Sequence, residues 1–155
     1  MTGDYFETGY PPAAFYFSVS FSGGSLVDDT SFSEVSGIAT EIETEAVSEG
    51  GENRFIHQLP RQVKHGNLEL KRGIARRTSP LVAWCKATLE GEFASPIQRR
   101  IIVVKLNGSV GGVLRAWQFN DAYPVKWSVD AFSSTKNEAA IEQMAFVYSY
   151  SQRIQ

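Results

Sequence analysis

Residues 13–21 read AAFYFSVSF and alternate between apolar and polar side chains with a period of two. One face would carry Phe15, Phe17, Val19 and Phe21, and the other would carry Tyr16, Ser18, Ser20 and Ser22. Because successive side chains of a strand point to opposite faces of a sheet, this pattern predicts a strand with one face in the core.

A second alternating run follows at residues 38–45, where isoleucines and threonines oppose an alanine and three glutamates. The sequence VSEGGEN at residues 47–53 has the composition of a turn, and a strand-like pattern resumes at residues 54–59. We therefore expect a long hairpin with one apolar and one acidic face.

Further strands are expected at residues 68–72, 101–106, 113–119 and 123–129, with a glycine-rich turn at residues 107–112. One helix is expected at residues 80–89, because Ser79 is a good N-cap, Pro80 suits the first helical position and Gly91 follows the end. The last element is ambiguous, since apolar spacing fits both a helix and a strand, and propensity favours a helix over residues 136–143. Six or so strands with one short helix indicate a mainly β fold, an antiparallel β-barrel or sandwich with a long hairpin and one short flanking α-helix.

Charge is divided unevenly along the chain. Residues 1–53 hold ten acidic side chains and no Lys or Arg, whereas residues 54–155 hold fifteen basic and seven acidic side chains. Two explanations stay open. Acidic and basic strands could pair across one sheet, or an acidic surface of one subunit could meet a basic surface of the next.

Length and composition fit a single globular domain. The 155 residues are 43% hydrophobic and 21% charged, and residues 1–155 are expected to form one domain with residues 1–9 as an N-terminal arm. The acidic N-terminus does not resemble a secretory signal, and the uncharged stretch at residues 8–27 is broken by prolines and paired glycines, so we expect no membrane anchor.

The sequence contains no recognisable arrangement of catalytic or metal-binding residues. Cys85 is the only cysteine, and with Leu81, Trp84 and Thr88 it shares an apolar helix face, where free cysteine usually packs as a small hydrophobe. The paired glycines lack a phosphate-binding context, and the doublets Arg76-Arg77 and Arg99-Arg100 are weak evidence for nucleic acid. We expect no catalytic residue, no metal site and no cofactor.

Several sequence segments, taken together and in order, resemble those of a known protein family. They are YPPAAFYFSVSF at residues 10–21, FSEVSGI at 32–38, EGGENRFIHQLP at 49–60, NLELKRG at 67–73, SPLVAW at 79–84, NDAYPVKWSV at 120–129 and NEAAIEQMAFVY at 137–148. The chain resembles the tail tube protein family of contractile phages and phage-tail-like injection particles, and the resemblance runs from about residue 10 to about residue 150.

The resemblance implies a β-barrel-like subunit, similar to the haemolysin-coregulated protein of type VI secretion. Such subunits form stacked hexameric rings inside a contractile sheath, joined to a baseplate, with cargo or DNA in the lumen. It also implies assembly in the bacterial cytoplasm, as part of a phage tail or extracellular injection particle. The resemblance does not decide whether the chain is the main tube subunit or a subunit of the initiator ring at the baseplate. It also does not decide whether the particle is a phage tail or an injection particle.

The resemblance assigns roles to two segments of the chain. It makes the final segment, residues 137–148, a strand rather than a helix, and it places the family's long hairpin on residues 41–59. On that mapping the subunit interface consists of Glu49, Gly50, Gly51, Glu52, Asn53 and Arg54.

The acid row Glu41, Glu43 and Glu45 is a candidate lining of the lumen, since an acidic wall would not hold polyanionic cargo, although these residues could instead face the next subunit. Two other classes of protein compete with a tube subunit. A monomeric small-ligand-binding β-barrel would also suit the aromatic content and alternating strands. A cell-wall hydrolase from the same particle is a weaker third reading, because no acid or nucleophile constellation is present.

Overall fold

The computed structural model describes residues 15–22, 29–48, 50–51, 54–73, 79–91, 96–108, 111–130 and 140–155. Most of these residues form an eight-stranded sheet in the order β2-β1-β7-β8-β9-β6-β3, with β10 paired to β8. Every strand pair in the sheet is antiparallel. The strands of this sheet are β1 (Phe15–Phe21), β2 (Asp29–Phe32), β3 (Glu34–Ser36), β6 (Leu68–Gly73), β7 (Arg100–Gly108), β8 (Val113–Val129), β9 (Ile141–Val147) and β10 (Tyr150–Arg153).

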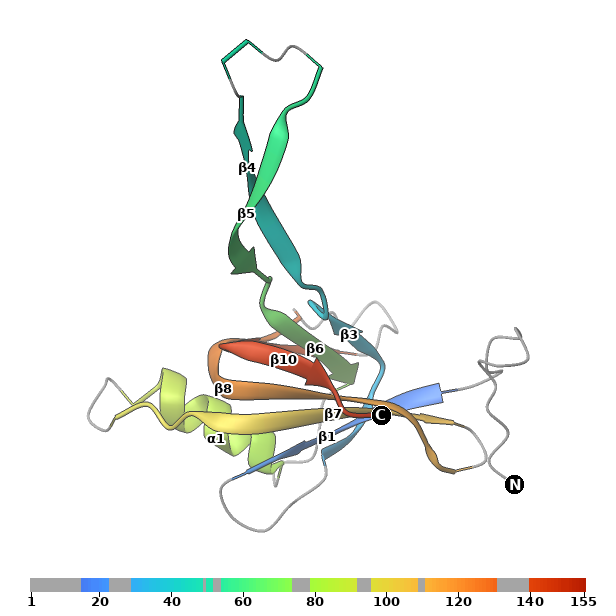
Figure 1. The fold of residues 1–155 in the computed structure, drawn as a ribbon. Helices are drawn as coiled ribbons and strands as arrows, with labels where there is room; N and C mark the ends of the chain where they lie inside the picture. Colours follow the sequence, from blue (N-terminus) through green and yellow to red (C-terminus); the bar gives the residue numbers. More distant parts are fainter. Residues whose placement is uncertain are drawn as a thin grey trace.

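The remaining elements are a separate two-stranded hairpin and one short helix. Strands β4 (Glu41–Val47) and β5 (His57–Lys64) pair only with each other in the described part of the chain. Helix α1 (Pro80–Leu89) lies beside the sheet (Figure 1). The expected long hairpin and flanking helix are therefore confirmed, with α1 as the single helix among the described residues. The second strand of the hairpin runs five residues beyond the expected end at Leu59.

The sheet curls because one short segment joins its two ends. Residues 29–36 supply both outer strands of the order, because β2 pairs with β1 at one end and β3 pairs with β6 at the other. Between the two strands, the Ser33 N–H donates to the Lys71 carbonyl oxygen at 3.0 Å. We call residues 29–36 the seam. The resulting half-barrel confirms the expected mainly antiparallel β class.

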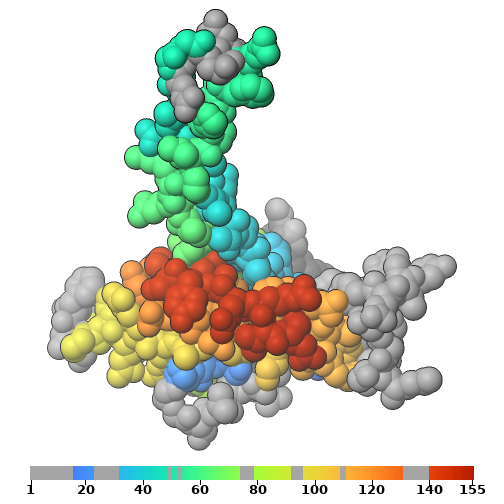
Figure 2. Space-filling view, in the orientation of Figure 1, coloured from blue at the N-terminus to red at the C-terminus, as the bar shows by residue number. Residues whose placement is uncertain are grey.

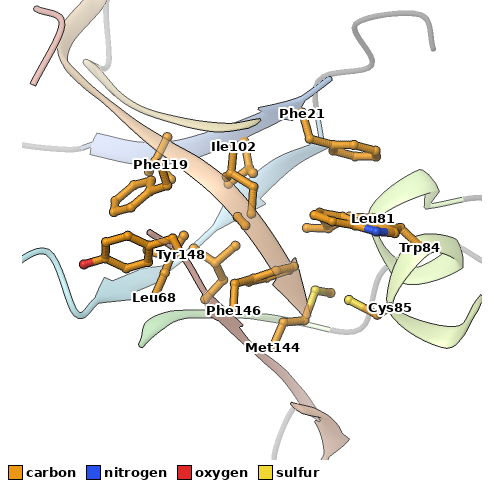
Figure 3. Packing of buried hydrophobic residues seen from close by; sticks show 14 of the residues in the cluster. Phe21, Leu68, Leu81, Trp84, Cys85, Ile102, Phe119, Met144, Phe146 and Tyr148 are labelled. Carbon is orange, nitrogen blue, oxygen red and sulfur yellow. The ribbon is translucent and has the colours of Figure 1, made fainter. Parts of the chain in front are cut away.

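Helix α1 begins and ends where the sequence predicts. Ser79 caps it, with its side-chain oxygen accepting from the Val82 N–H at 3.4 Å, and Pro80 is the first helical residue. Leu81, Trp84 and Cys85 on its inner face are buried. Figure 3 shows these three side chains directed at Phe21, Phe146 and Met144 of the sheet, and the Trp84 ring lies 5.4 Å from the Phe21 ring. The expected burial of Cys85 is confirmed.

Strand β1 departs from the expected division into a buried and a solvated face. Val19 and Phe21 are buried as predicted, but Ser18 and Ser20 on the opposite face are buried too. Strand β1 is paired on both sides, by β2 and β7, so neighbouring strands flank these two short side chains. Ser18 Oγ also accepts a hydrogen bond from Asn107 Nδ2 at 2.9 Å.

Two expected boundaries are corrected, and the structure decides the nature of the ambiguous last element. Residues 38–40 are not in a strand, so the second alternating run begins at Glu41. The two runs at 113–119 and 123–129 form one strand, β8, which continues through Asp121 at a positive φ of 53°. The final segment forms strand β9 from Ile141, as the resemblance implies. Helix propensity is overridden here because β8 and β6 pair with β9 on its two sides. Residues 131–139 lie outside the described residues.

Candidate subunit interface on the projecting hairpin

The β4–β5 hairpin stands away from the body of the molecule (Figures 1 and 2). Every residue of β5 and every residue of β4 except Glu43 is solvent-exposed. An isolated two-stranded hairpin is at best marginally stable in water, because it has no hydrophobic face to bury. The hairpin is therefore an element that needs a partner.

Large apolar side chains are concentrated on this hairpin. Phe55 and Ile56 are 65% and 64% exposed, and they lie directly between the turn and β5. The set of exposed large hydrophobic residues on the hairpin is Ile42, Val47, Phe55, Ile56, Leu59 and Val63. Grouped apolar exposure of this kind marks a protein contact surface. We call these six residues the apolar hairpin set.

The acid row keeps its predicted alternation but is not purely acidic. Positions 41, 43 and 45 of one strand share a face. Lys64 of β5 forms an ion pair with Glu43, and Arg61 Nε lies 3.5 Å from Glu45 Oε2. The register of the ladder shifts between Ile42 and Thr44, which is where β5 contributes an extra residue. The row thus carries both signs of charge, and its proposed place in a lumen stays a prediction.

The predicted interface at the tip lies partly within the described residues. Gly50, Gly51 and Arg54 are exposed, and Gly51 has a φ of +94°, a conformation that favours glycine. Glu49, Glu52 and Asn53 lie outside the described residues. Phe55 and Ile56 are not among the interface residues expected from the sequence. The signal for them is that two bulky apolar residues are adjacent in the sequence. A strand with one buried face can bury only one of two successive side chains.

The uneven charge along the chain is explained in part by pairing within the subunit. Glu43, Glu45 and Glu34 each face a base from the later part of the chain, the last through Lys71 Nζ at 3.5 Å. These pairs join neighbouring strands, so the explanation by acidic and basic strands is confirmed where the structure describes it. Such exposed pairs contribute only about 0–1 kcal/mol each.

Other candidate chemical sites have structural roles. Arg100 lies over the Trp84 ring at 5.1 Å and Arg99 over the Tyr123 ring at 5.6 Å, so this basic doublet packs on aromatic side chains. Arg76 and Arg77 lie outside the described residues. In the described part of the chain, no group of three or more His, Cys, Asp or Glu side chains could hold a metal ion. No helix within those same residues is long and apolar enough to cross a membrane.

The described residues thus form a curled antiparallel sheet with a flanking helix and a projecting hairpin that exposes apolar side chains. The family model of the T4-like virus tail tube protein gp19 matches residues 13–152, and the chain belongs to this family. No curated protein sequence matches the chain.

Solved structures agree with this assignment. The chain is similar to a chain in the cryo-EM structure of the anti-feeding prophage baseplate, with 26% identity, a TM-score of 0.77 and coverage of 93% of this chain and 95% of that one. It is similar to a chain of the PVC sheath-tube complex of an extracellular contractile injection system in the extended state, with 20% identity, a TM-score of 0.76 and coverage of 99% and 97%. Hcp1 from Salmonella typhimurium shares the fold more distantly, at 14% identity, a TM-score of 0.55 and coverage of 90% and 85%.

Proposed function

We propose that this chain is the repeating subunit of the inner tube of a contractile injection particle or phage tail, in which hexameric rings stack around a central channel. The observation that carries the proposal is the apolar hairpin set, exposed on a tail tube fold. An unsupported hairpin with six large exposed hydrophobic side chains is best explained by burial against another copy of the subunit.

The tip of the hairpin would be the first point of contact between copies. Glu49, Gly50, Gly51, Glu52, Asn53 and Arg54 would form it, and Phe55 and Ile56 would extend it toward β5. A ring or stack needs two different complementary surfaces on each subunit. The hairpin would provide one of them, and the body of a neighbouring copy would provide the other.

The subunit would act as a conduit and not as an enzyme. The tube would assemble on a baseplate in the bacterial cytoplasm. Contraction of the sheath would drive the rigid tube through a target envelope, and cargo or DNA would leave through the lumen. Glu41, Glu43 and Glu45 would line that lumen, with Arg61 and Lys64 limiting their net charge. A wall of nearly balanced charge would neither hold nor strongly repel a polyanion.

Electron microscopy of the purified protein at increasing concentration tests the proposal. Rings or tubes with a central channel are the expected result. A lone 17.2 kDa particle at all concentrations would contradict it and would favour the monomeric ligand-binding barrel.

A second candidate is the initiator ring that joins the tube to the baseplate. The observation that favours it is the 26% identity to a chain in the anti-feeding prophage baseplate structure. An initiator would form single rings that seed tubes of a second subunit, whereas a main tube subunit would elongate alone. Single rings that never elongate without a second subunit would therefore favour the initiator.

A further inference from the structure

The β4–β5 hairpin continues a ladder that starts in the body. Strands β3 and β6 pair up to Ser36 and Glu69, and β4 and β5 begin to pair at Glu41 and Lys64. Between the two ladders, residues 37–40 and 65–67 belong to no strand. The ribbon changes direction at this break and leaves the body (Figure 1). We call these two short segments the legs of the hairpin.

The legs are in close contact with each other. Gly37 has a φ of +86°, and a Cβ at this position would lie 1.8 Å from the Asn67 carbonyl oxygen. Only glycine fits there, both because of its conformation and because of this approach. A bend at the break therefore moves both legs together.

Tyr148, directly after β9, contacts both legs. Its hydroxyl donates to the Gly37 carbonyl oxygen at 3.1 Å, and its ring stacks on the His65 ring with 4.0 Å between centroids and 9° between planes. The Tyr148 ring is itself held in the core, edge-on to Phe119 at 4.9 Å (Figure 3). Burial raises the pKa of Tyr148, so its hydroxyl keeps the proton that it donates. One core side chain thus fixes both legs.

The His65 ring makes a second connection between a leg and the body. Nδ1 lies 3.1 Å from the Gly66 carbonyl oxygen and Nε2 lies 3.2 Å from the Ser149 carbonyl oxygen. Because both ring nitrogens face carbonyl oxygens, the N–H of either tautomer has an acceptor. The contact of Nε2 with the Ser149 carbonyl oxygen connects the second leg to the segment that follows β9.

We propose that Tyr148 and His65 are positioning residues that set the direction in which the hairpin leaves the body, and so aim its tip at the next copy of the subunit. The second part of this proposal, that the hairpin direction aims the tip at the next copy, rests on the proposed function; we call it the aiming step. The fixing of the hairpin direction rests on the contacts of Tyr148 and His65 alone.

Pulsed electron spin resonance can measure the hairpin direction. Spin labels are placed on Gln58→Cys of β5 and Gln152→Cys of β10, both exposed sites, in a Cys85→Ala background. Labelled protein is diluted into unlabelled protein, so that only distances within one subunit are recorded. The variants are Tyr148→Phe, which keeps the ring and removes the hydroxyl, and His65→Phe, which keeps the stack and removes both ring nitrogens. Tyr150→Phe, at an exposed tyrosine two residues away, is the matched control.

We expect Tyr148→Phe and His65→Phe to broaden the distance distribution and to shorten tubes seen by microscopy, while Tyr150→Phe changes neither. His65→Gln, which restores one donor, should partly recover the narrow distribution.

Unchanged widths in both variants would overturn the proposal. Broadened distributions with tubes of normal length would overturn the aiming step. If the unsubstituted protein forms no tubes, the proposed function fails, but the distance widths still decide whether Tyr148 and His65 fix the hairpin.

Discussion

Arg72 and Glu142 form an ion pair inside the half-barrel, with Arg72 Nε 3.0 Å from Glu142 Oε2 and side chains that are 2% and 4% exposed. Both charges have further partners. Arg72 Nη2 donates to Ser79 Oγ at 2.8 Å, and Trp127 Nε1 donates to Glu142 Oε1 at 2.8 Å. The pair therefore connects strands β6, β8 and β9 with the N-terminus of α1.

Replacing Arg72 by leucine should destabilise the subunit strongly. The change leaves a buried carboxylate without its cation, and removing one partner of a buried pair typically costs about 3–5 kcal/mol. Lys71→Leu on the same strand is the control, since it removes the exposed pair with Glu34 and should cost less than about 1 kcal/mol. Urea unfolding of both variants measures the two free energies, and equal losses would contradict the prediction.

The double variant Phe55→Ser, Ile56→Ser should prevent assembly without unfolding the subunit. Both side chains are exposed, so their loss should change the free energy of unfolding by no more than about 0.5 kcal/mol. Analytical ultracentrifugation should show subunits in place of tubes. Leu89→Ser, at an exposed site on α1, is a control for reduced surface hydrophobicity and should still assemble. Normal tubes from the double variant would exclude these two residues from the contact.

Reversing the charge of Arg54 to glutamate should shorten tubes more than it lowers the melting temperature of the subunit. Arg54 is exposed at the turn, so the isolated subunit gains little from it, whereas a contact between copies is repeated around every ring. Tube length in the unsubstituted protein should also fall as salt is added, because exposed charges are screened over about 8 Å at physiological ionic strength. Arg153→Glu on β10 is the comparison variant. Tubes of Arg54→Glu that are lost only where the subunit melts would contradict this prediction.

The raised pKa of Tyr148 predicts how the stability of the subunit changes at alkaline pH. The folded state favours the neutral phenol, so this contribution is fully present below the unfolded tyrosine value of about 10 and is lost as the pH rises through the folded value. Unfolding free energies measured from about pH 8 to about pH 12 should fall less steeply in Tyr148→Phe than in the unsubstituted protein. Parallel curves for the two proteins would show that Tyr148 is not responsible.

Local sequence signals were sufficient for several elements. Ser79, Pro80 and Gly91 lie within a few residues of the helix ends and predict α1 correctly. The alternation of β1 and the dense β-branched run of β7 predict their strands. For β9 the local pattern was ambiguous, and helix propensity was overridden by pairing with β6 and β8, two strands that are distant in the sequence.

The features that sequence reasoning missed depend on register and on neighbours. Strands β2, β3 and β10 are three or four residues long, too short for a periodic pattern. Arg72 and Glu142 are brought opposite each other by the register of β6 and β9, which no local signal fixes. The exposure of both Phe55 and Ile56 depends on the position of the hairpin, because two adjacent apolar residues indicate only that one of them would not face the core of its own subunit.

The seam at residues 29–36 has a consequence for the rate of folding. Its two strands pair with β1 and with β6, and those strands pair in turn with β7 and β9 far along the chain. In sheets built from such distant pairings, the chain loses loop-closure entropy before the stabilising contacts form. Such sheets fold on a timescale of about milliseconds to seconds. A newly made subunit would therefore expose unpaired strand edges until its C-terminal strands are in place, and premature association during that interval would compete with ordered polymerisation.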